Sequence, residues 1–163
     1  VSQLLVGYGS AAKRARDRFH MGAVARKLPA GTYDIKSGLS GDDLAEAALA
    51  WLLAGYSYDR YVKPSTAIAG LVAPDGVDAA RIAIIANGEA LTRELINTPA
   101  SDMGPDELEE ATRTLAAGHD ASITVTTGDD LITSNFPMLH TVGRASTRAP
   151  RLIDMRWGDK APS

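Results

Sequence analysis

Residues 77–118 contain two helical patterns separated by a short break that is rich in proline and glycine. The first pattern, Val77–Asn97, repeats isoleucine and leucine at three- and four-residue intervals, which is typical of a helix with an apolar stripe. The break, NTPASDMGP, holds two prolines and a glycine, and proline within a helix removes a hydrogen bond and clashes with the preceding turn. Pro105 suits the first position of a second helix, because its missing N–H would have no partner there. The sequence therefore predicts a long helix, a fixed corner at Asn97–Pro105 and a second helix that ends at Gly118.

Strand-like and helix-like segments alternate along the rest of the chain. We predict strands at residues 4–10, 32–38, 67–76, 121–127 and 149–158, and a short strand within residues 136–146 that ends at Gly143. We predict helices at residues 11–28, 40–56 and 128–135, and a loop or edge strand at residues 57–66. This order favours an α/β fold with mainly parallel sheet elements flanked by helices.

The long helix marks the best candidate boundary between two partial domains that it joins. We therefore divide the chain into residues 1–76, the later part of an N-terminal α/β domain, the connecting helix 77–97, and residues 98–163, the start of a second domain.

Composition excludes several classes of protein. The chain has 163 residues, 45% of them hydrophobic and 23% charged, which is the profile of a folded globular protein. It has no cysteine, and therefore no disulfide, thiolate metal site or cysteine nucleophile. A net charge of −3 without a basic block argues against nucleic acid or an anionic membrane as a partner. The longest apolar-rich stretch, residues 44–56, is shorter than the roughly 20 residues of a membrane helix.

Both ends of the chain pass directly into or out of apolar segments, and the first residue is Val1. We therefore expect a fragment of a longer protein. The absence of cysteine suits the cytoplasm.

The stretch GYGSAAK, Gly7–Lys13, follows a predicted strand and opens a predicted helix, with Ser10 as its N-cap. Backbone N–H groups at such a helix start can bind a phosphate. The stretch lacks the full Gly-x-Gly-x-x-Gly pattern, because residue 12 is alanine, and no serine or threonine follows its lysine. A tight turn explains it better, and a phosphate or nucleotide site is the third of our functional hypotheses.

Histidines and carboxylates form no metal-binding pattern. The histidines are His20, His119 and His140. None lies three or four residues from another, so they do not predict zinc or manganese ligands. The adjacent carboxylate pairs are Asp42/Asp43, Glu109/Glu110 and Asp129/Asp130. Negative charge at a helix start is favourable, which accounts for the first and third pairs, and the middle pair fits a solvated helix face.

Nucleophile patterns and basic residues are also poor candidates for a site. Ser101 has no neighbouring base, and GRAST, Gly143–Thr147, lacks the glycine-flanked nucleophile elbow. A locally basic patch comprises Arg144, Arg148, Arg151 and Arg156. The patch could bind an acidic partner or nucleic acid. The default interpretation is that these arginines keep the edge of a strand soluble. Taken from the residues alone, the chain contains no complete active site.

Two longer stretches carry a more specific signal. RELINTPASDMGPDELEEATRTLA, residues 93–116, has a helix that ends in an Asn-x-Pro turn before another helix. GDDLITSNFPMLHTVGRASTRAPRLIDMRWG, residues 128–158, has a short helix, the motif F-P-x-x-H-x-V-G-R-A-S and an apolar strand that ends in Trp-Gly. In this order the motifs resemble the leucyl aminopeptidase family, also called the cytosol aminopeptidases, where the helix leads into the catalytic domain. Residues 1–76 resemble the family's N-terminal domain less distinctively.

The resemblance implies a metal-dependent exopeptidase, a hydrolase that releases N-terminal amino acids from peptides. Such a metalloprotease uses two divalent cations, zinc or manganese, to activate a water molecule and polarise the scissile carbonyl. A lysine and an arginine assist. The resemblance also implies a cytoplasmic homo-oligomer, a hexamer, that acts on peptide substrates.

The chain departs from the family at the positions that matter for catalysis. The family's metal ligands and catalytic lysine lie in a GKG…DTGG-like stretch and an NTDAEGR-like stretch, and neither occurs here. INTPASD shares Asn-Thr with the second stretch, but Pro99 stands where the acidic ligand belongs. We therefore give no catalytic role to Asn97 or Asp102, and predict no catalytic, metal-binding or substrate-binding residue in this chain. The fragment alone is expected to be inactive and to bind no catalytic metal.

A second hypothesis is a non-enzymatic α/β module that binds a protein partner or DNA. The arginines at residues 144–156 support it, whereas the acidic balance and the lack of a basic stripe weigh against it.

Overall fold

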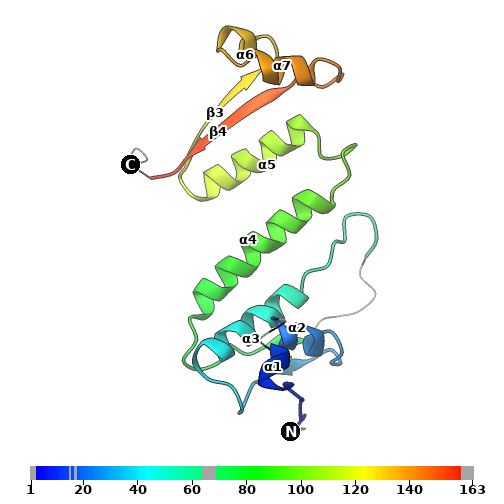
Figure 1. Cartoon of the computed structure of the whole chain (residues 1–163), viewed down its shortest axis with the longest axis vertical. Coiled ribbons are helices and arrows are strands. Elements are labelled where there is room, and N and C mark those ends of the chain that lie inside the picture. Colours follow the sequence, from blue (N-terminus) through cyan, green and yellow to red (C-terminus); the bar gives the residue numbers. More distant parts are fainter. Residues whose placement is uncertain (1–2, 15, 17, 64–68, 159–163) are drawn as a thin grey trace. The chain divides into compact units, whose positions relative to one another are not determined.

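The structure is a computed structural model that describes residues 3–14, 16, 18–63 and 69–158. It contains two compact units, Val1–Asn97 and Thr98–Ser163 (Figure 1). The elements of the first unit are α1 (Ala11–Arg14), α2 (His20–Ala25), β1 (Thr32–Tyr33), α3 (Gly41–Ala54), β2 (Gly70–Leu71) and α4 (Ala79–Asn97). Those of the second unit are α5 (Pro105–Gly118), β3 (Ser122–Thr127), α6 (Asp130–Thr133), α7 (Pro137–Gly143) and β4 (Arg151–Arg156).

The core of the first unit lies between α2 and α3, where small side chains let the helices approach closely. Its buried residues are Met21, Ala25, Ala47, Ala50, Trp51, Ala54 and Ala69. A Cβ on Gly22 of α2 would lie 2.9 Å from the backbone oxygen of Ala50, so glycine is needed at this contact. The indole N–H of Trp51 donates to the carbonyl of Ala69 at 2.6 Å, which keeps the buried donor paired.

Helix α3 confirms the helix predicted at residues 40–56. Asp42 and Asp43 lie in its first turn, where they complement the partial positive charge of the helix start. Ser40 precedes the helix in extended conformation, and Gly55 follows its last residue.

The long helix predicted at residues 77–97 is α4. Asp78 caps it, since its Oδ1 accepts a hydrogen bond from the N–H of Arg81 at 3.0 Å. At the other end, the hydroxyl of Tyr56 donates to Glu94 at 2.9 Å and accepts from the amide of Asn97 at 3.2 Å. These bonds fix the last turn of α4 against the end of α3. Within the described part of the chain, no helix is both long and apolar enough to cross a bilayer.

In the second unit, β3 and β4 form an antiparallel ribbon, with Ser122 opposite Arg156 and Thr127 opposite Arg151. Because side chains alternate between the faces of a strand, Val125, Ile153 and Arg151 share one face. Helix α5 packs beside the ribbon, and α6 and α7 lie at one of its ends (Figure 1).

The strand predicted at residues 4–10 is wrong. Residues 4–10 are neither helix nor strand, and the side chain of Leu5 is fully exposed. A strand is held by hydrogen bonds to a neighbouring strand, and no described segment pairs with these residues. Apolar residues with a preference for strands were therefore not sufficient to form a strand at residues 4–10.

The continuous helix predicted at residues 11–28 is also wrong. Phe19, just before α2, has φ 61°, in the left-handed region that a right-handed helix cannot include. The helical residues fall into α1 and α2, and α2 ends at Ala25. Ser10 still acts at the start of α1, because its Oγ accepts from the N–H of Lys13 at 3.4 Å.

The short strand predicted within residues 136–146 is helix α7. Pro137 is its first residue, where proline is favoured, and the hydroxyl of Thr141 donates to the carbonyl of Pro137 at 2.8 Å. The short helix at residues 128–135 and the strands at residues 121–127 and 149–158 are confirmed as α6, β3 and β4.

The strands predicted at residues 32–38 and 67–76 are much shorter than expected. They pair over two residues each, Thr32 with Gly70 and Tyr33 with Leu71; residues 67 and 68 lie outside the described part. Residues 57–63 form a loop, and residues 64–66 of the predicted loop or edge strand also lie outside it.

The α/β class is confirmed. Among the described residues β1 pairs with β2 in parallel, whereas the longer β3–β4 pair is antiparallel. Helices α6 and α7 stay at the end of the ribbon instead of crossing its face, so β4 returns beside β3 in the opposite direction. The three-part division at residues 76 and 97 stays a proposal.

Two glycine substitutions test this packing in opposite directions. We expect Gly22→Ala to lower the free energy of unfolding by about 1–2 kcal/mol, because its Cβ overlaps the α3 backbone. Gly88→Ala serves as the control, since a Cβ there meets no atom within 4 Å; it should raise the free energy of unfolding by about 1 kcal/mol through helix propensity. Urea unfolding followed by circular dichroism measures both, and equal effects would contradict the assignment of Gly22 to a close contact.

Candidate functional site

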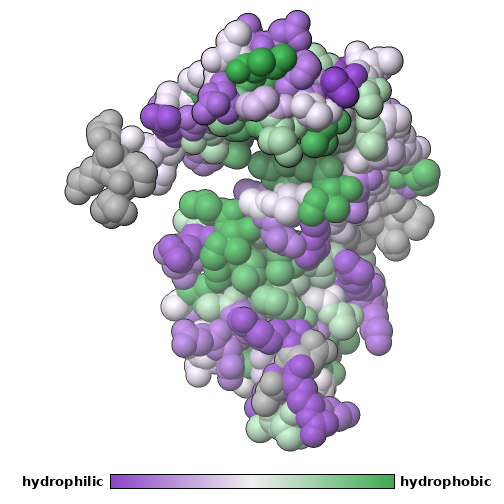
Figure 2. Space-filling view, turned by 45° about the horizontal axis from the view of Figure 1, so that its top comes forward, coloured by the Kyte–Doolittle hydropathy of each residue, from purple (hydrophilic) through white to green (hydrophobic). Residues whose placement is uncertain are grey.

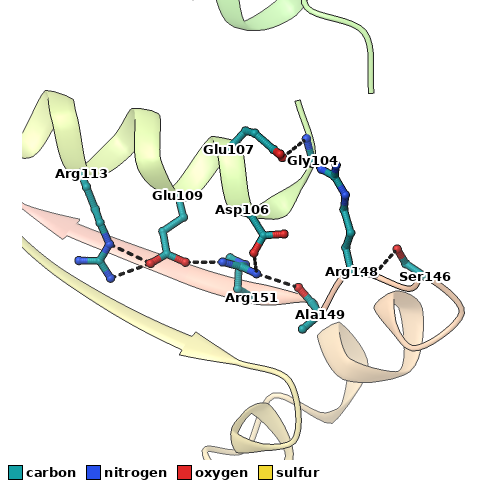
Figure 3. A network of polar contacts seen from close by, with 9 residues as sticks. All are labelled: Gly104, Asp106, Glu107, Glu109, Arg113, Ser146, Arg148, Ala149 and Arg151. Carbon is teal, nitrogen blue, oxygen red and sulfur yellow. Dashed lines mark hydrogen bonds and ion pairs between the residues drawn. The ribbon is translucent and has the colours of Figure 1, made fainter. Parts of the chain in front are cut away.

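The most developed polar site of the chain joins α5 to the segment that leads into β4 (Figure 3). Its charged members are Asp106, Glu107, Glu109, Arg113, Arg148 and Arg151, which we call the arginine–carboxylate network. The carboxylates and Arg113 lie on α5, whereas Arg148 and Arg151 lie about forty residues further along the chain. Three carboxylates thus meet three guanidinium groups within one unit.

Arg151 is the most enclosed member of the network. Its side chain is only 11% exposed, and its two terminal nitrogens bond to Glu109 at 2.5 Å and to Asp106. Asp106 and Glu109 are three residues apart and so lie on one side of α5. The fork of a guanidinium fits two acceptors on one side of a helix, which a lysine amine would not match as well.

Arg148 holds the corner that precedes α5. One terminal nitrogen lies 2.5 Å from Glu107, and the other donates to the carbonyl of Ser101 at 3.1 Å. The guanidinium lies directly over Gly104, where any Cβ would overlap it. Gly104 has φ −92°, which any residue adopts, so it is the arginine that requires glycine here.

Glu107 is the third residue of α5 and also binds the turn before it. Its carboxylate accepts from the N–H of Gly104 at 2.9 Å, which is half of a capping box because glycine supplies no side chain. Hydrogen bonds from its own N–H and that of Gly104, and then the charge of Arg148, lower the pKa of Glu107.

Glu109 is shared by two arginines, with Arg113 at 2.7 Å and Arg151 at 2.5 Å. Hydrogen bonds from Arg113 and then Arg151 lower the pKa of Glu109, against the opposing effect of burial. The middle carboxylate pair was predicted to face solvent. That prediction is wrong for Glu109, whose side chain is 17% exposed, and holds for Glu110.

This site does not fit a divalent metal. Each network carboxylate is paired with an arginine, and a guanidinium beside a carboxylate repels a further cation. Across the described residues, no three or more histidine, aspartate or glutamate side chains are placed to hold a metal ion. The network can therefore anchor the backbone and helix α5. The prediction that the chain has no catalytic, metal-binding or substrate-binding residue stays a prediction.

The other carboxylate pairs lie where the sequence placed them, at helix starts. Asp42 and Asp43 lie in the first turn of α3, and Asp130 lies in the first turn of α6 after Asp129.

The three histidines have different local surroundings, His20 in the first unit and His119 and His140 in the second. The Nε2 of His140 on α7 lies 3.2 Å from Oδ1 of Asp129. His20 starts α2 with its ring edge-on to Tyr8, and His119 follows α5.

The Gly7–Lys13 stretch opens only a four-residue helix, α1. Gly7, Gly9 and Lys13 line a shallow hollow of about 240 Å³ together with His20 and Lys27. At the helix start the N–H groups of Lys13 and Arg14 already donate to the carbonyl of Ser10, both at 3.0 Å. The turn therefore explains the stretch, and the phosphate hypothesis gains no support.

The candidate nucleophiles and the basic patch have structural roles. The carbonyl of Ser101 accepts from Arg148, and the hydroxyl of Ser146, in the GRAST segment, accepts from the N–H of Arg148 at 3.1 Å. Interpreting the arginines as a solvated edge is wrong for Arg148 and Arg151, which belong to the network, and Arg156 pairs with Asp154 at 2.7 Å.

Comparison with known proteins assigns the chain to a family. Residues 90–163 match the model described as the cytosol aminopeptidase family, catalytic domain, and residues 2–74 match the model of the M17 aminopeptidase N-terminal domain. The chain belongs to the cytosol aminopeptidase family. The predicted resemblance to leucyl aminopeptidases is thereby confirmed.

Individual family members agree with this assignment. The probable cytosol aminopeptidase of Rhodococcus erythropolis is 32% identical over 98% of this chain and 35% of its own length. Among solved structures, cytosol aminopeptidase from Coxiella burnetii matches 87% of this chain and 31% of that protein, with a TM-score of 0.77 and 36% identity. The bottromycin maturation enzyme BotP in complex with Mn matches 91% of this chain and 34% of that protein, with a TM-score of 0.70 and 25% identity. The chain thus spans about a third of the length of the family members it matches.

The network was missed by sequence analysis. Glu107 and Arg148 are 41 residues apart, and no periodic pattern connects them. One local signal was present: a glutamate at the third position of a helix that begins with proline commonly bonds back to the preceding turn.

A double-mutant cycle tests the contact of Gly104 with Arg148. We expect Gly104→Ala to lower the free energy of unfolding, because its Cβ would overlap the guanidinium of Arg148 and displace it from Glu107. In an Arg148→Ala background the same change should have almost no effect. Equal costs in both backgrounds, measured by urea unfolding, would refute the contact.

Acid should weaken the network in a defined direction. Because folding lowers the pKa of Glu107 and Glu109, their contribution is complete above the unfolded value of about 4.5 and is lost as pH falls through the folded values. The variant Glu107→Gln/Glu109→Gln should therefore lose stability at neutral pH and show a shallower decline between about pH 5 and about pH 3. Glu110→Gln, at an exposed neighbour outside the network, is the control and should retain the wild-type decline.

Proposed function

We propose that this chain is part of a metal-dependent aminopeptidase that releases N-terminal amino acids from peptides. The observation that carries the proposal is the match of two domain models of one peptidase family, in family order, to residues 2–74 and 90–163. On this proposal residues 1–76 belong to the N-terminal domain, residues 77–97 form the connecting helix, and residues 98–163 begin the catalytic domain.

The metal ions of the whole enzyme, two divalent cations of manganese or zinc, would activate water and polarise the scissile carbonyl. The manganese complex of BotP supports manganese. The carboxylates of the network are not suited to hold these ions, because arginines already neutralise them. The ligands would belong to parts of the family's catalytic domain beyond the third that the chain spans.

The contribution of the described residues is to shape the start of the catalytic domain. Arg148 fixes the backbone at Ser101 and Gly104, and Arg151 fixes α5 on the ribbon. We further propose a cytoplasmic homo-oligomer, a hexamer as the family resemblance implies, with peptides as its substrates.

DNA binding gains no support from the geometry. Arg148, Arg151 and Arg156 direct their charge to carboxylates of this chain, so little of the predicted basic patch is free to contact phosphates.

Hydrolysis of leucine p-nitroanilide tests the proposed function. The protein expressed from its complete reading frame should hydrolyse the substrate with Mn²⁺ or Zn²⁺ and lose activity on chelation. The chain of residues 1–163 should release no p-nitroaniline under the same conditions, because neither of the family's two metal-ligand stretches occurs in its sequence. Hydrolysis by the purified 163-residue chain, or none by the complete protein on a panel of amino-acid p-nitroanilides, would contradict the proposal.

A further inference from the structure

Two dipeptides of the first unit have the chemistry to rearrange without an enzyme. They are Asp75–Gly76 and Asn87–Gly88, and the sequence holds no other Asp-Gly or Asn-Gly pair. Glycine is the decisive second residue, because without a side chain it lets its backbone nitrogen approach the side-chain carbonyl carbon of the residue before it. From the sequence alone Asn87–Gly88 should react first, since an amide releases ammonia more readily than a carboxyl group releases water.

Both pairs are open to solvent. All four residues are exposed, and neighbouring Ile84 on α4 is 70% exposed. Figure 2 shows hydrophobic surface in the middle of the view, where Figure 1 draws α4. A Cβ added at Gly76 or at Gly88 would meet nothing within 4 Å. Accessibility therefore does not separate the two pairs, and the backbone around each must decide which one reacts.

Asn87 and Gly88 lie in the middle of α4, Ala79–Asn97. The N–H of Gly88 is there committed to an intrahelical hydrogen bond, and its carbonyl accepts from the hydroxyl of Thr92 at 2.9 Å. Ring closure must rotate the backbone of Asn87 out of the helical range, so the surrounding turns of α4 would have to open. Such openings cost more in the middle of a helix than at its fraying ends.

Asp75 and Gly76 form the middle of a turn between β2 and α4. The carbonyl of Pro74 accepts from the N–H of Val77 at 3.4 Å, and Gly76 has φ 80°, as a type II turn requires at its third position. Within the described part of the chain, the N–H of Gly76 donates no hydrogen bond, and the carboxyl group of Asp75 has no hydrogen-bond or ion-pair partner. Of the described contacts, one long hydrogen bond thus opposes the rotation that ring closure needs.

We propose that Asp75 is a site of spontaneous isomerisation in the folded chain, whereas α4 protects Asn87. The backbone nitrogen of Gly76 bonds to the side-chain carboxyl carbon of Asp75 and gives up its proton, and the carboxyl hydroxyl leaves with that proton as water. Water then opens the five-membered ring at either carbonyl, which returns aspartate or gives isoaspartate. The proposal rests on the turn and on α4 and is independent of the proposed peptidase activity.

Isomerisation changes the connection between β2 and α4. In isoaspartate the main chain runs through the side-chain carbons, which adds one methylene group to the backbone. The added group lies close to Asp78, whose side chain caps α4 by accepting from the N–H of Arg81. The turn bond from Val77 to Pro74 cannot keep its geometry across the longer chain, so we expect the modified turn to hold the start of α4 less firmly.

Incubation of the 163-residue chain in heavy-oxygen water at neutral pH tests the proposal, because opening of the ring places one heavy oxygen at the reacted residue. Trypsin puts Asp75 and Asn87 on separate peptides, residues 61–81 and 82–93. In the folded chain, mass spectrometry should find heavy oxygen at Asp75 before it finds deamidation at Asn87. A product that co-elutes with a synthetic isoaspartyl peptide identifies the isomer. Asp78, on the same peptide but followed by alanine, is the internal control and should stay unlabelled.

Unfolding in guanidinium chloride should reverse the order of the two reactions. The rate at Asn87 should rise at least about a hundredfold, because opening of α4 no longer limits it, whereas the rate at Asp75 should change by less than about threefold. Asp75→Glu retains the charge but would need a six-membered ring, so it should remove the label from its peptide. Asp78→Glu is the matched control and should retain the label. Faster reaction at Asn87 than at Asp75 in the folded chain, equal acceleration of both by unfolding, or a label that persists in Asp75→Glu overturns the proposal.

Discussion

Arg151 determines how the second unit is assembled. A two-stranded ribbon is marginal by itself and needs a further layer, which here is α5. Of the described hydrophobic side chains in this unit, Leu131 and Ala116 are buried, while Ile123, Val125 and Ile153 are only partly so. Apolar contact is non-directional, so it brings α5 to the ribbon without fixing its rotation. The fork of Arg151, bound to Asp106 and Glu109 on one side of α5, supplies that direction.

In the first unit the orientation of the packed helices is fixed by the shape of small side chains rather than by charge pairs. Between α2 and α3, glycine and alanine bring two backbones together, and the large side chains of Met21 and Trp51 fill the space that remains. The indole hydrogen bond to Ala69 then ties the segment before β2 to α3. Such packing tolerates little added volume at Gly22, whereas charge pairs tolerate small displacements, so the two units should differ in their sensitivity to substitution.

Local signals predicted the elements that depend on local physics. Acidic residues at Asp42 and Asp43, proline at Pro105 and the periodic apolar residues of α4 belong to their own helices, and these helices were found. The strand expected at residues 4–10 depends on a neighbouring strand, and the break at Phe19 depends on one positive φ that no composition reveals. The short strand predicted within residues 136–146 overlooked two local signals of a helix: Leu139 and Val142 are three residues apart, and proline stands at the first position of α7. The network was beyond sequence analysis because Arg148 and Arg151 reach carboxylates more than forty residues away.

The same long-range bonds explain why Asn97–Pro105 is a corner and not a flexible linker. Within it, the carbonyl of Pro99 accepts from the N–H groups of Asp102 and Met103, both at 2.8 Å, which closes a local turn. Arg148 then binds the carbonyl of Ser101 and covers Gly104. Arg148 lies three residues before the first residue of β4, so we expect it to reach this position only when the ribbon has formed. The corner at the start of the second unit is thus completed by a residue near the end of that unit. We expect its final shape to form together with β3, β4 and α5 in one cooperative step.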